Sequence, residues 1–250
     1  MGPYEENFIE EKLKEYNLLI NENQCGEFRI SKSTGITEGY LYEKEKEMNI
    51  EIPELWEDSR LISRIGPKEI EGYYEIIKWA KGKVAVVGLG LGYLAQELSK
   101  KKDIKEVVVY ESNPDIVSLY KKNYPEKKKI RIMEVDTLKA RRRKFDFFFV
   151  DTYGYKLGVN IVEDYIKYNK KHNIQEYSFC GMEHFLLSCS YEEIVWVYVP
   201  EIWMEMSKDI SRELEKSGYM QCYKQLDEKL VSEVLAEFKI VLNEGEDEEE

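Results

Sequence analysis

Three acidic residues in the middle of this 250-residue chain, Glu111, Asp136 and Asp151, each come shortly after a run of mostly apolar residues. Carboxylates accept hydrogen bonds from hydroxyl and amino groups, and a desolvated carboxylate can act as a general base. The apolar runs, rich in Val, Ile and Phe, predict strands that are buried on both faces of a parallel sheet. Because the carboxyl ends of such strands meet at one edge of an open sheet, we expect the three carboxylates to surround one ligand.

A fourth apolar run, residues 84–87, leads directly into the alternating glycines Gly88, Gly90 and Gly92. Glycines allow a sharp turn of the backbone and a close approach to a ligand. A helix-like pattern follows them, and the start of a helix offers unpaired backbone N–H groups. This combination predicts the nucleotide-binding turn of a doubly wound α/β fold.

The same residues are compatible with two cofactors, NAD and S-adenosylmethionine. Glu111 lies about 20 positions beyond the glycines, where an acidic residue accepts hydrogen bonds from ribose hydroxyls. Tyr93 stands where a dinucleotide pattern has its third glycine, which permits close packing beneath a pyrophosphate. S-adenosylmethionine has no pyrophosphate, and Asp136 could accept a hydrogen bond from its adenine amino group. The pattern therefore favours S-adenosylmethionine over NAD, because an NAD site would leave Asp136 without a role.

Four segments resemble the class I S-adenosylmethionine-dependent methyltransferases, and within them the branch shaped like spermidine synthase. They are VVGLGLGYLA (86–95), VVVYESNPDIV (107–117), IRIMEVDTL (130–138) and FDFFFVDTYG (145–154). The resemblance implies that the glycines lie against the methionine and ribose, that Glu111 holds the ribose, and that Asp136 takes the adenine amino group. The cofactor-binding residues that it implies are Gly88, Leu89, Gly90, Gly92, Glu111, Ser112, Asn113, Asp136, Thr137 and Asp151.

Asp151 and Tyr153 are the candidate catalytic residues. In aminopropyltransferases a fourth-strand Asp begins a D-S-x-D loop that helps to deprotonate the amine; Asp151 matches its first Asp, whereas Gly154 stands at the second. Methyl transfer is an in-line displacement, for which Asp151 could serve as base and Tyr153 could orient the acceptor. In the branch shaped like spermidine synthase, a tyrosine and an acidic neighbour at a similar distance before the glycines line the substrate pocket. Tyr74 and Glu75 occupy comparable positions here, so the resemblance implies that they contact the substrate, as does Tyr153.

Each of these assignments has a structural alternative. Asp151 could only fix its loop or the cofactor's amino group, and Tyr74 fits a helical stripe that packs into a core. Three functions therefore follow in order: a methyltransferase acting on a small molecule or a protein side chain, an aminopropyltransferase, and a binding or scaffolding protein that keeps the pocket without turnover. An NAD-dependent oxidoreductase ranks fourth.

Composition restricts the partners. The net charge of −12 argues against broad nucleic-acid binding, although six acids lie in the last seven residues and two basic patches remain, at residues 127–131 and 139–144. We expect these patches to lie in solvated loops. A contact between them and an acidic ligand or RNA is the alternative. Two histidines and four scattered cysteines predict no metal site, and the chain has neither a membrane-spanning run nor a signal peptide, which predicts a cytoplasmic protein. A homodimer is also left open.

The fold class predicted is α/β, with a doubly wound, mostly parallel sheet, a small N-terminal α+β extension and a C-terminal helical extension. The predicted units are residues 1–66, the cofactor-binding domain 67–192, the mainly helical part 193–243 and a disordered acidic tail 244–250. The elements predicted outside the cofactor motifs are a helix at 4–23, a hairpin of strands 28–30 and 39–42, a strand at 50–52 stopped by Pro53, and helices at 67–80, 91–101, 160–171 and 182–190. Beyond these, strands are predicted at 175–180, 194–199 and 219–223, and helices at 200–216 and 226–242.

Overall fold

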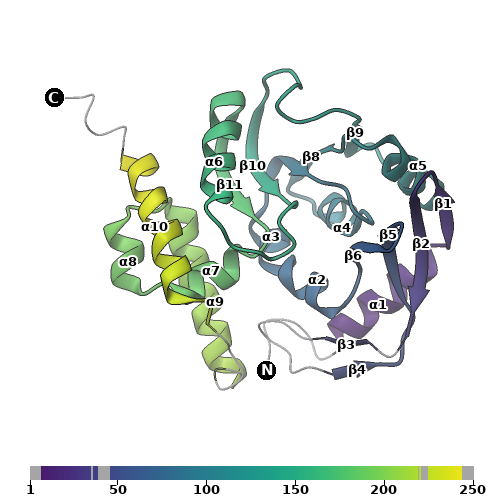
Figure 1. Ribbon diagram of the computed structural model, residues 1–250, viewed down its shortest axis with the longest axis horizontal. Coiled ribbons are helices and arrows are strands. Elements are labelled where there is room, and N and C mark those ends of the chain that lie inside the picture. Colours follow the sequence, from purple (N-terminus) through teal and green to yellow (C-terminus); the bar gives the residue numbers. More distant parts are fainter. Residues whose placement is uncertain (1–6, 35, 39–45, 219, 221–224, 244–250) are drawn as a thin grey trace.

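A five-stranded parallel sheet forms the centre of the computed structural model, which describes residues 7–34, 36–38, 46–218, 220 and 225–243 (Figure 1). Its strand order is β11-β10-β7-β8-β9, and every neighbouring pair is parallel. The bounds are β7 Gly82–Val87, β8 Ile104–Tyr110, β9 Ile130–Met133, β10 Lys144–Val150 and β11 Asn173–Phe179. The prediction of a doubly wound α/β fold is confirmed.

The strand order reverses at β7, and this reversal creates the ligand-binding edge. From β7 the chain moves outward to β8 and β9, and then returns to the other side of β7 for β10 and β11. Because crossovers between parallel strands are right-handed, the helix α4 (Tyr93–Lys100) after β7 and the helix α6 (Asn160–Lys171) after β10 lie on opposite faces. The central strands are consequently covered on both sides, and Val84, Val108 and Phe148 are fully buried.

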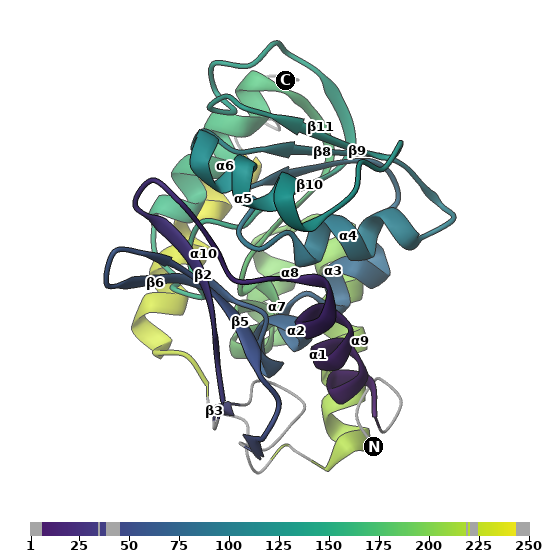
Figure 2. The ribbon, with the colours of Figure 1, turned by 90° about the vertical axis from the view of Figure 1, so that its right-hand side faces the viewer.

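The N-terminal part forms a second, antiparallel sheet that lies against the carboxyl edge of the first (Figure 2). Its order is β1-β2-β5-β6, with β1 Asn23–Cys25, β2 Phe28–Ser33, β5 Ile52–Glu57 and β6 Arg60–Arg64. The predicted pairing of residues 28–30 with 39–42 is wrong for the first strand, because β2 pairs with β1 and β5; residues 39–42 lie outside the described part of the chain. A separate ribbon joins β3 (Ile36–Glu38) to β4 (Lys46–Met48).

Pro53 does not stop a strand, contrary to the sequence prediction. It is the second residue of β5, opposite Lys32 of β2, and its carbonyl accepts a hydrogen bond from the Ile65 N–H at 3.1 Å. Proline lacks an N–H donor but keeps its carbonyl, so it is tolerated near the start of a strand. The strand therefore continues through Pro53 to Glu57.

Helix α1 (Phe8–Leu19) is tied to α4 by a nearly buried carboxylate. Glu97 of α4 accepts hydrogen bonds from the Tyr16 hydroxyl and the Lys12 ammonium, each at 2.7 Å, and also from Lys100. Burial opposes the charge of Glu97, but these donors outweigh burial and lower its pKa. The N-terminal helix is thereby fixed to the helix that follows the glycine turn.

The predicted helix at residues 67–80 is two short helices, α2 (Pro67–Gly72) and α3 (Tyr74–Trp79), which meet at Tyr73. Helix α5 (Pro114–Asn123) begins after Asn113, whose side chain accepts hydrogen bonds from the backbone N–H groups of Asp115 and Ile116. The bounds of α6 match the predicted 160–171.

The C-terminal part is helical, with α7 Met182–Ser188, α8 Tyr191–Trp196, α9 Glu201–Ser217 and α10 Glu228–Asn243. The strand predicted at 194–199 is wrong. Ser190 and Glu193 form a reciprocal capping box, which starts a helix in spite of the β-branched run that follows. Gly218, with φ of 72°, ends α9, whereas the strand predicted at 219–223 lies almost entirely outside the described residues.

Trp203 of α9 anchors these helices to the central sheet. Its side chain is fully buried, its indole N–H donates to the Tyr177 carbonyl at 2.7 Å, and its ring packs edge-on against Phe179 and Phe238. Trp196 and Tyr198, which lie close to Trp203 in the sequence, are instead 61% and 66% exposed.

We predict that Trp203→Phe lowers the free energy of unfolding by about 2 kcal/mol, because the Tyr177 carbonyl loses its buried partner and a cavity forms. Urea denaturation measures this change. Trp196→Phe, the same substitution at an exposed site, should change stability by less than about 0.5 kcal/mol. Equal effects at the two positions would show that the C-terminal helices do not contribute to the core of the sheet.

Candidate active site

A cavity of about 730 Å³ opens between the carboxyl edge of the parallel sheet and a wall formed by β6 and α2. Pockets that hold small molecules and cofactors commonly measure about 300–1,000 Å³. Five of the residues that the sequence predicts for the cofactor and both that it predicts for catalysis line this cavity, Asp151 belonging to both groups. They are Gly88, Leu89, Gly90, Glu111, Asp151 and Tyr153.

One repeated hydrogen bond positions the lining residues at the sheet edge. Gly88, Asp151 and Cys180 are each the first residue after their strands, β7, β10 and β11. Each donates its backbone N–H to the carbonyl at the end of a neighbouring strand: Gly88 to Tyr110, Asp151 to Val87, and Cys180 to Val150, at 2.8–2.9 Å. Glu111, which follows β8, makes the same bond to Met133 of β9. The sheet ladder therefore extends one residue beyond each strand and fixes the start of each loop.

Gly88 is required where the turn passes Asp151. Its φ is 99°, and a Cβ at this position would lie 2.7 Å from the backbone oxygen of Asp151. Gly90 also has a positive φ, and a Cβ there would lie 3.1 Å from Ser63 Oγ of β6. Gly92 has a different role: it is the left-handed residue before α4 and packs against the Tyr120 ring, so it does not line the cavity.

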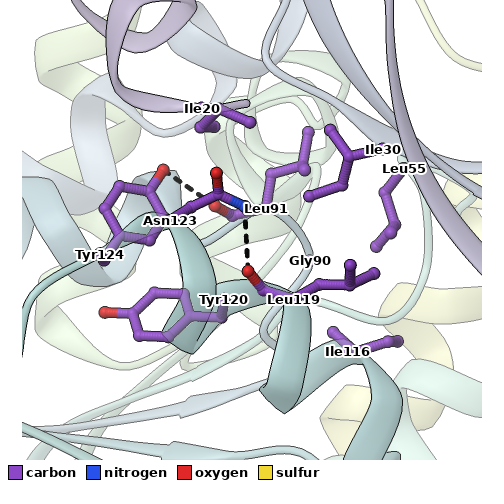
Figure 3. Close-up of a pocket in the computed structure, with 10 residues that line it drawn as sticks. All are labelled: Ile20, Ile30, Leu55, Gly90, Leu91, Ile116, Leu119, Tyr120, Asn123 and Tyr124. Carbon is purple, nitrogen blue, oxygen red and sulfur yellow. Dashed lines mark hydrogen bonds between the residues drawn. The ribbon is translucent and has the colours of Figure 1, made fainter. Parts of the chain in front are cut away.

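The N-terminal sheet supports the glycine turn from behind (Figure 3). Ile20, Ile30 and Leu55 surround Leu91, whose carbonyl accepts a hydrogen bond from the Tyr124 hydroxyl at 3.0 Å. The gap enclosed here is only about 10 Å³, which is at most the space of one water molecule. This region is a packing contact that holds the turn in place.

Glu111 joins the glycine turn to the start of α5. One carboxylate oxygen accepts from the Leu89 N–H at 3.2 Å, and the other accepts from the Asn113 N–H at 2.8 Å. A carboxylate offers about four acceptor positions, so two remain for ligand hydroxyls. Glu111 thus faces the cavity in a fixed orientation and can still bind a ribose.

Asp151 is the carboxylate with the most perturbed chemistry. The Tyr73 hydroxyl donates to its Oδ2 at 2.5 Å, and the Cys180 thiol also donates to it. Burial raises the pKa of Asp151 to about 6, and the two donors reduce this shift without cancelling it. Burial also raises the pKa of Tyr73 and of Cys180 well above their usual values, and the Asp151 charge adds to both shifts. At neutral pH Asp151 is therefore ionised beside two neutral donors.

The loop after Asp151 supplies two more aromatic residues. The Tyr153 hydroxyl donates to Asp164 of α6 at 2.8 Å, so its ring lines the cavity while its hydroxyl is held by the protein. Tyr155 has a positive φ of 61° and lies under the Lys68 ammonium, 4.7 Å from the ring centroid. The role of Tyr153 in orienting an acceptor stays a prediction.

Several predicted site residues lie away from this cavity. Asp136 is exposed in the loop after β9 and accepts a hydrogen bond from the Leu138 N–H at 2.8 Å, whereas Thr137 beside it is buried. Ser112 is exposed, and Asn113 caps α5. The structure thus brings two of the three carboxylates to one cavity, and the predicted contact of Asp136 with adenine stays a prediction.

Tyr74 and Glu75 also point away from the cavity. The Tyr74 ring packs edge-on against Phe8 of α1, and Glu75 accepts from the Trp79 indole at 3.1 Å beside Lys78. The break between α2 and α3 turns Tyr73 toward the cavity in their place.

Sequence reasoning missed Tyr73, Cys180 and the wall residues Ser63 and Lys68. Cys180 had a usable signal, because it follows the fifth strand as Asp151 follows the fourth. Ser63 and Lys68 had no such signal in the sequence, because their position beside the cavity depends on how the two sheets pack. In the part of the chain that the structure describes, no group of three or more His, Cys, Asp or Glu side chains could hold a metal ion, and no helix is long and apolar enough to cross a membrane.

We predict that Gly88→Ala destabilises the protein by roughly 2 kcal/mol more than Gly218→Ala. Both glycines have a positive φ, so alanine costs about 1 kcal/mol at either site. At Gly88 the new Cβ must also displace the Asp151 backbone, whereas at Gly218 it meets nothing within 4 Å. Denaturant unfolding of the two variants measures the difference, and equal losses would disprove the tight contact.

We further predict that Asp151→Asn stabilises the protein increasingly from about pH 4 upward, with the full effect above pH 6. The folded pKa is about 6 and the ordinary value is 3.8, so the stabilising contribution of the protonated carboxyl is lost as the pH rises through 6. A neutral Asn should raise the free energy of unfolding by up to about 3 kcal/mol at pH 8 and by about half of that at pH 5.

Denaturation at the two pH values tests this second prediction. Asp103→Asn, at an exposed side chain before β8, is the matched control, and its effect should stay below about 0.5 kcal/mol at both. A destabilised Asp151→Asn variant at pH 8 would contradict the burial cost assigned to Asp151.

Comparisons with known proteins leave the activity of this chain open. No model of a known protein family matches this sequence, and no curated protein matches it either. Among solved structures, the spermidine synthase of Thermotoga maritima is 12% identical and aligns over 79% of this chain and 62% of its own, with a TM-score of 0.42.

Two further solved structures align over shorter stretches. Precorrin-8w decarboxylase of Methanobacterium thermoautotrophicum is 25% identical over 43% of this chain and 59% of its own, with a TM-score of 0.34. The N-methyltransferase NodS of Bradyrhizobium japonicum is 16% identical over 42% of this chain and 62% of its own, also with a TM-score of 0.34. The chain thus spans less than two thirds of the length of each of these neighbours. The parallel sheet order and the glycine turn after the central strand give the chain the doubly wound α/β fold that the sequence predicts.

Proposed function

We propose that this protein is an S-adenosylmethionine-dependent methyltransferase that acts on a small molecule or a protein side chain. The observation that carries the proposal is the convergence of the glycine turn, Glu111 and Asp151 on one cavity of about 730 Å³. The turn allows a ligand to approach the backbone, Glu111 has acceptor positions for two hydroxyls, and Asp151 is a desolvated carboxylate next to the turn.

The residues present fit the cofactor. Glu111 would bind the ribose hydroxyls, since its oxygens keep free acceptor positions after bonding Leu89 and Asn113. Gly88 and Gly90 would lie beside the methionine portion, because both line the cavity and have no side chain that would keep a ligand from the backbone. The bound cofactor would supply an activated methyl group, and the protein's task would be alignment.

Asp151 would act on the acceptor. As the acceptor's nucleophilic atom forms a bond to the methyl carbon and the carbon–sulfur bond breaks, an attached proton must leave the acceptor. Asp151 can take that proton at neutral pH, because its pKa is about 6. Tyr73 would hold the carboxylate in place, since its hydroxyl donates to Oδ2 and its own pKa is raised by burial and by Asp151. Activity should therefore rise with pH through about 6.

Methyl transfer ranks ahead of the other adenosyl chemistries. Gly154 stands where the aminopropyltransferase loop has a second Asp. A dinucleotide needs close helix packing beneath its pyrophosphate, but Tyr93 fills that position, 1% exposed and stacked on Tyr73. Both features leave S-adenosylmethionine as the ligand that best matches the cavity.

We predict that the wild-type protein binds S-adenosylmethionine and S-adenosylhomocysteine in calorimetry, and that Glu111→Gln weakens both at least tenfold. A neutral amide loses the charge-assisted bonds to ribose hydroxyls, which are each worth about 1.5–3 kcal/mol. Glu134→Gln is the matched control, because Glu134 follows the neighbouring strand β9 but is exposed and paired with Lys121.

Three results would refute the proposal. They are the absence of binding to wild type, full binding by Glu111→Gln, and an equal loss in Glu134→Gln. Methyl transfer to acceptors in a lysate, measured with labelled cofactor, separates an enzyme from a binding protein that lacks turnover.

A further inference from the structure

The amino edge of the parallel sheet, opposite the cavity, gathers basic residues from five separate segments. In the three positions before each of β7, β8, β9, β10 and β11, eleven of fifteen residues are Lys or Arg and one, Asp103, is acidic. Across the whole chain, Lys and Arg occupy only about one position in seven. Because all five strands are parallel, these segments meet at one edge of the molecule, which we call the basic edge. It comprises Lys81 and residues 101–102, 127–129, 141–143 and 170–171.

Side-chain contacts confirm that these segments lie together. Glu106, at the start of β8, is within 4 Å of three cations from different elements: Lys83 at 3.2 Å, Arg143 at 3.7 Å and Arg131 at 3.9 Å. A single carboxylate is therefore the nearby acidic partner of three positive charges. Burial lowers the pKa of His172, and the nearby Lys171, Arg142 and Arg143 lower it further, whereas a hydrogen bond to the Thr137 backbone acts in the opposite direction.

Most of this charge is not neutralised by the protein. Within the described part of the chain, Lys102, Lys128, Arg141 and Arg142 are exposed and make no ion pair, whereas Asp103 lies 3.6 Å from Lys101. Lys170 and Lys171 lie in the last turn of α6 and compensate its dipole, which explains these two members of the basic edge. Residues 127–129 and 141–143 lie in connections that follow no helix end directly, so this explanation does not cover them.

The geometry points to the basic edge as a docking surface for the phosphate backbone of double-stranded RNA. Arg guanidinium groups match phosphate oxygens with two parallel hydrogen bonds, and uncompensated cations bind polyanions by releasing their counterions. The segments of the basic edge contain no exposed large apolar side chain, in the described residues, that could enter a membrane.

The surface suits RNA better than DNA. Helices reach this edge only with their C-terminal ends, so no described helix is placed to enter a B-form major groove. A-form RNA is recognised chiefly through its shape and its phosphates, which a row of strand-end loops can contact. In Figure 1 the loop between β9 and β10 rises away from β6 and α2. The length of β10 separates the two edges by roughly 20 Å, so bound RNA would leave the cavity open.

Fluorescence anisotropy with a labelled 20-base-pair RNA duplex of arbitrary sequence tests the inference. We expect the full-length wild-type protein to bind in 50 mM KCl, and the affinity to fall steeply by 200 mM. The triple variant Lys128→Gln, Arg141→Gln, Arg142→Gln should bind at least tenfold more weakly, with a salt dependence reduced by about two to three phosphate contacts. The control variant Lys208→Gln, Lys216→Gln, Lys229→Gln removes the same charge from α9 and α10 and should bind as wild type does.

Two results with RNA would overturn the inference: no binding by wild type at 50 mM KCl, or an equal loss of affinity in the control variant. Two results with other ligands would do the same. They are binding to a DNA duplex of the same sequence as tightly as to RNA, and binding to phosphatidylserine vesicles more tightly than to RNA. Thermal midpoints of both triple variants, expected to equal that of wild type, exclude unfolding as the cause of any loss. The inference does not rest on the proposed function, because the triple variant should bind S-adenosylmethionine as wild type does.

Discussion

The contact between the glycine turn and the end of β10 is the constraint on which the site depends. Gly88 N–H bonds Tyr110 of β8, and Asp151 N–H bonds Val87 of β7, so three strand ends are joined within one turn of the chain. A Cβ at Gly88 would lie 2.7 Å from the Asp151 oxygen, closer than atoms can pack. A displacement of the turn would therefore also displace Asp151 and the floor of the cavity.

The cost of that arrangement falls on Asp151. Its burial raises the pKa to about 6, and holding it ionised at neutral pH opposes folding. The protein offsets part of this cost with Tyr73 and Cys180, both of which donate to the carboxylate. A strained or destabilised group persists where surrounding structure over-determines it, and such groups concentrate at functional sites. Here α1, the N-terminal sheet and the Trp203 anchor supply the packing that holds the two flanks of the cavity.

Charge is segregated between the two edges of the sheet. Carboxylates follow β8 and β10 at the cavity edge, whereas Lys and Arg precede all five strands at the opposite edge. The net charge of −12 hides this division, because acids elsewhere in the chain, including six in the last seven residues, outnumber the cations of the basic edge. An argument from net charge against nucleic-acid binding therefore describes the average surface and does not apply to the basic edge.

The sequence by itself determined the parallel sheet, the glycine turn and the residues that follow each strand. These depend on local signals: continuous apolar runs, alternating glycines and a carboxylate directly after Val150 or Tyr110. Only the tertiary structure decided which of those residues share a cavity. Tyr73 faces Asp151 because the helix predicted at 67–80 breaks there, Ser63 reaches Gly90 because two sheets pack together, and Asp136 lies outside the cavity in its exposed loop. Contacts between segments far apart in the chain depend on packing and strand order, which leave no local pattern in the sequence; the basic edge likewise exists only because parallel strands bring five separate segments to one side.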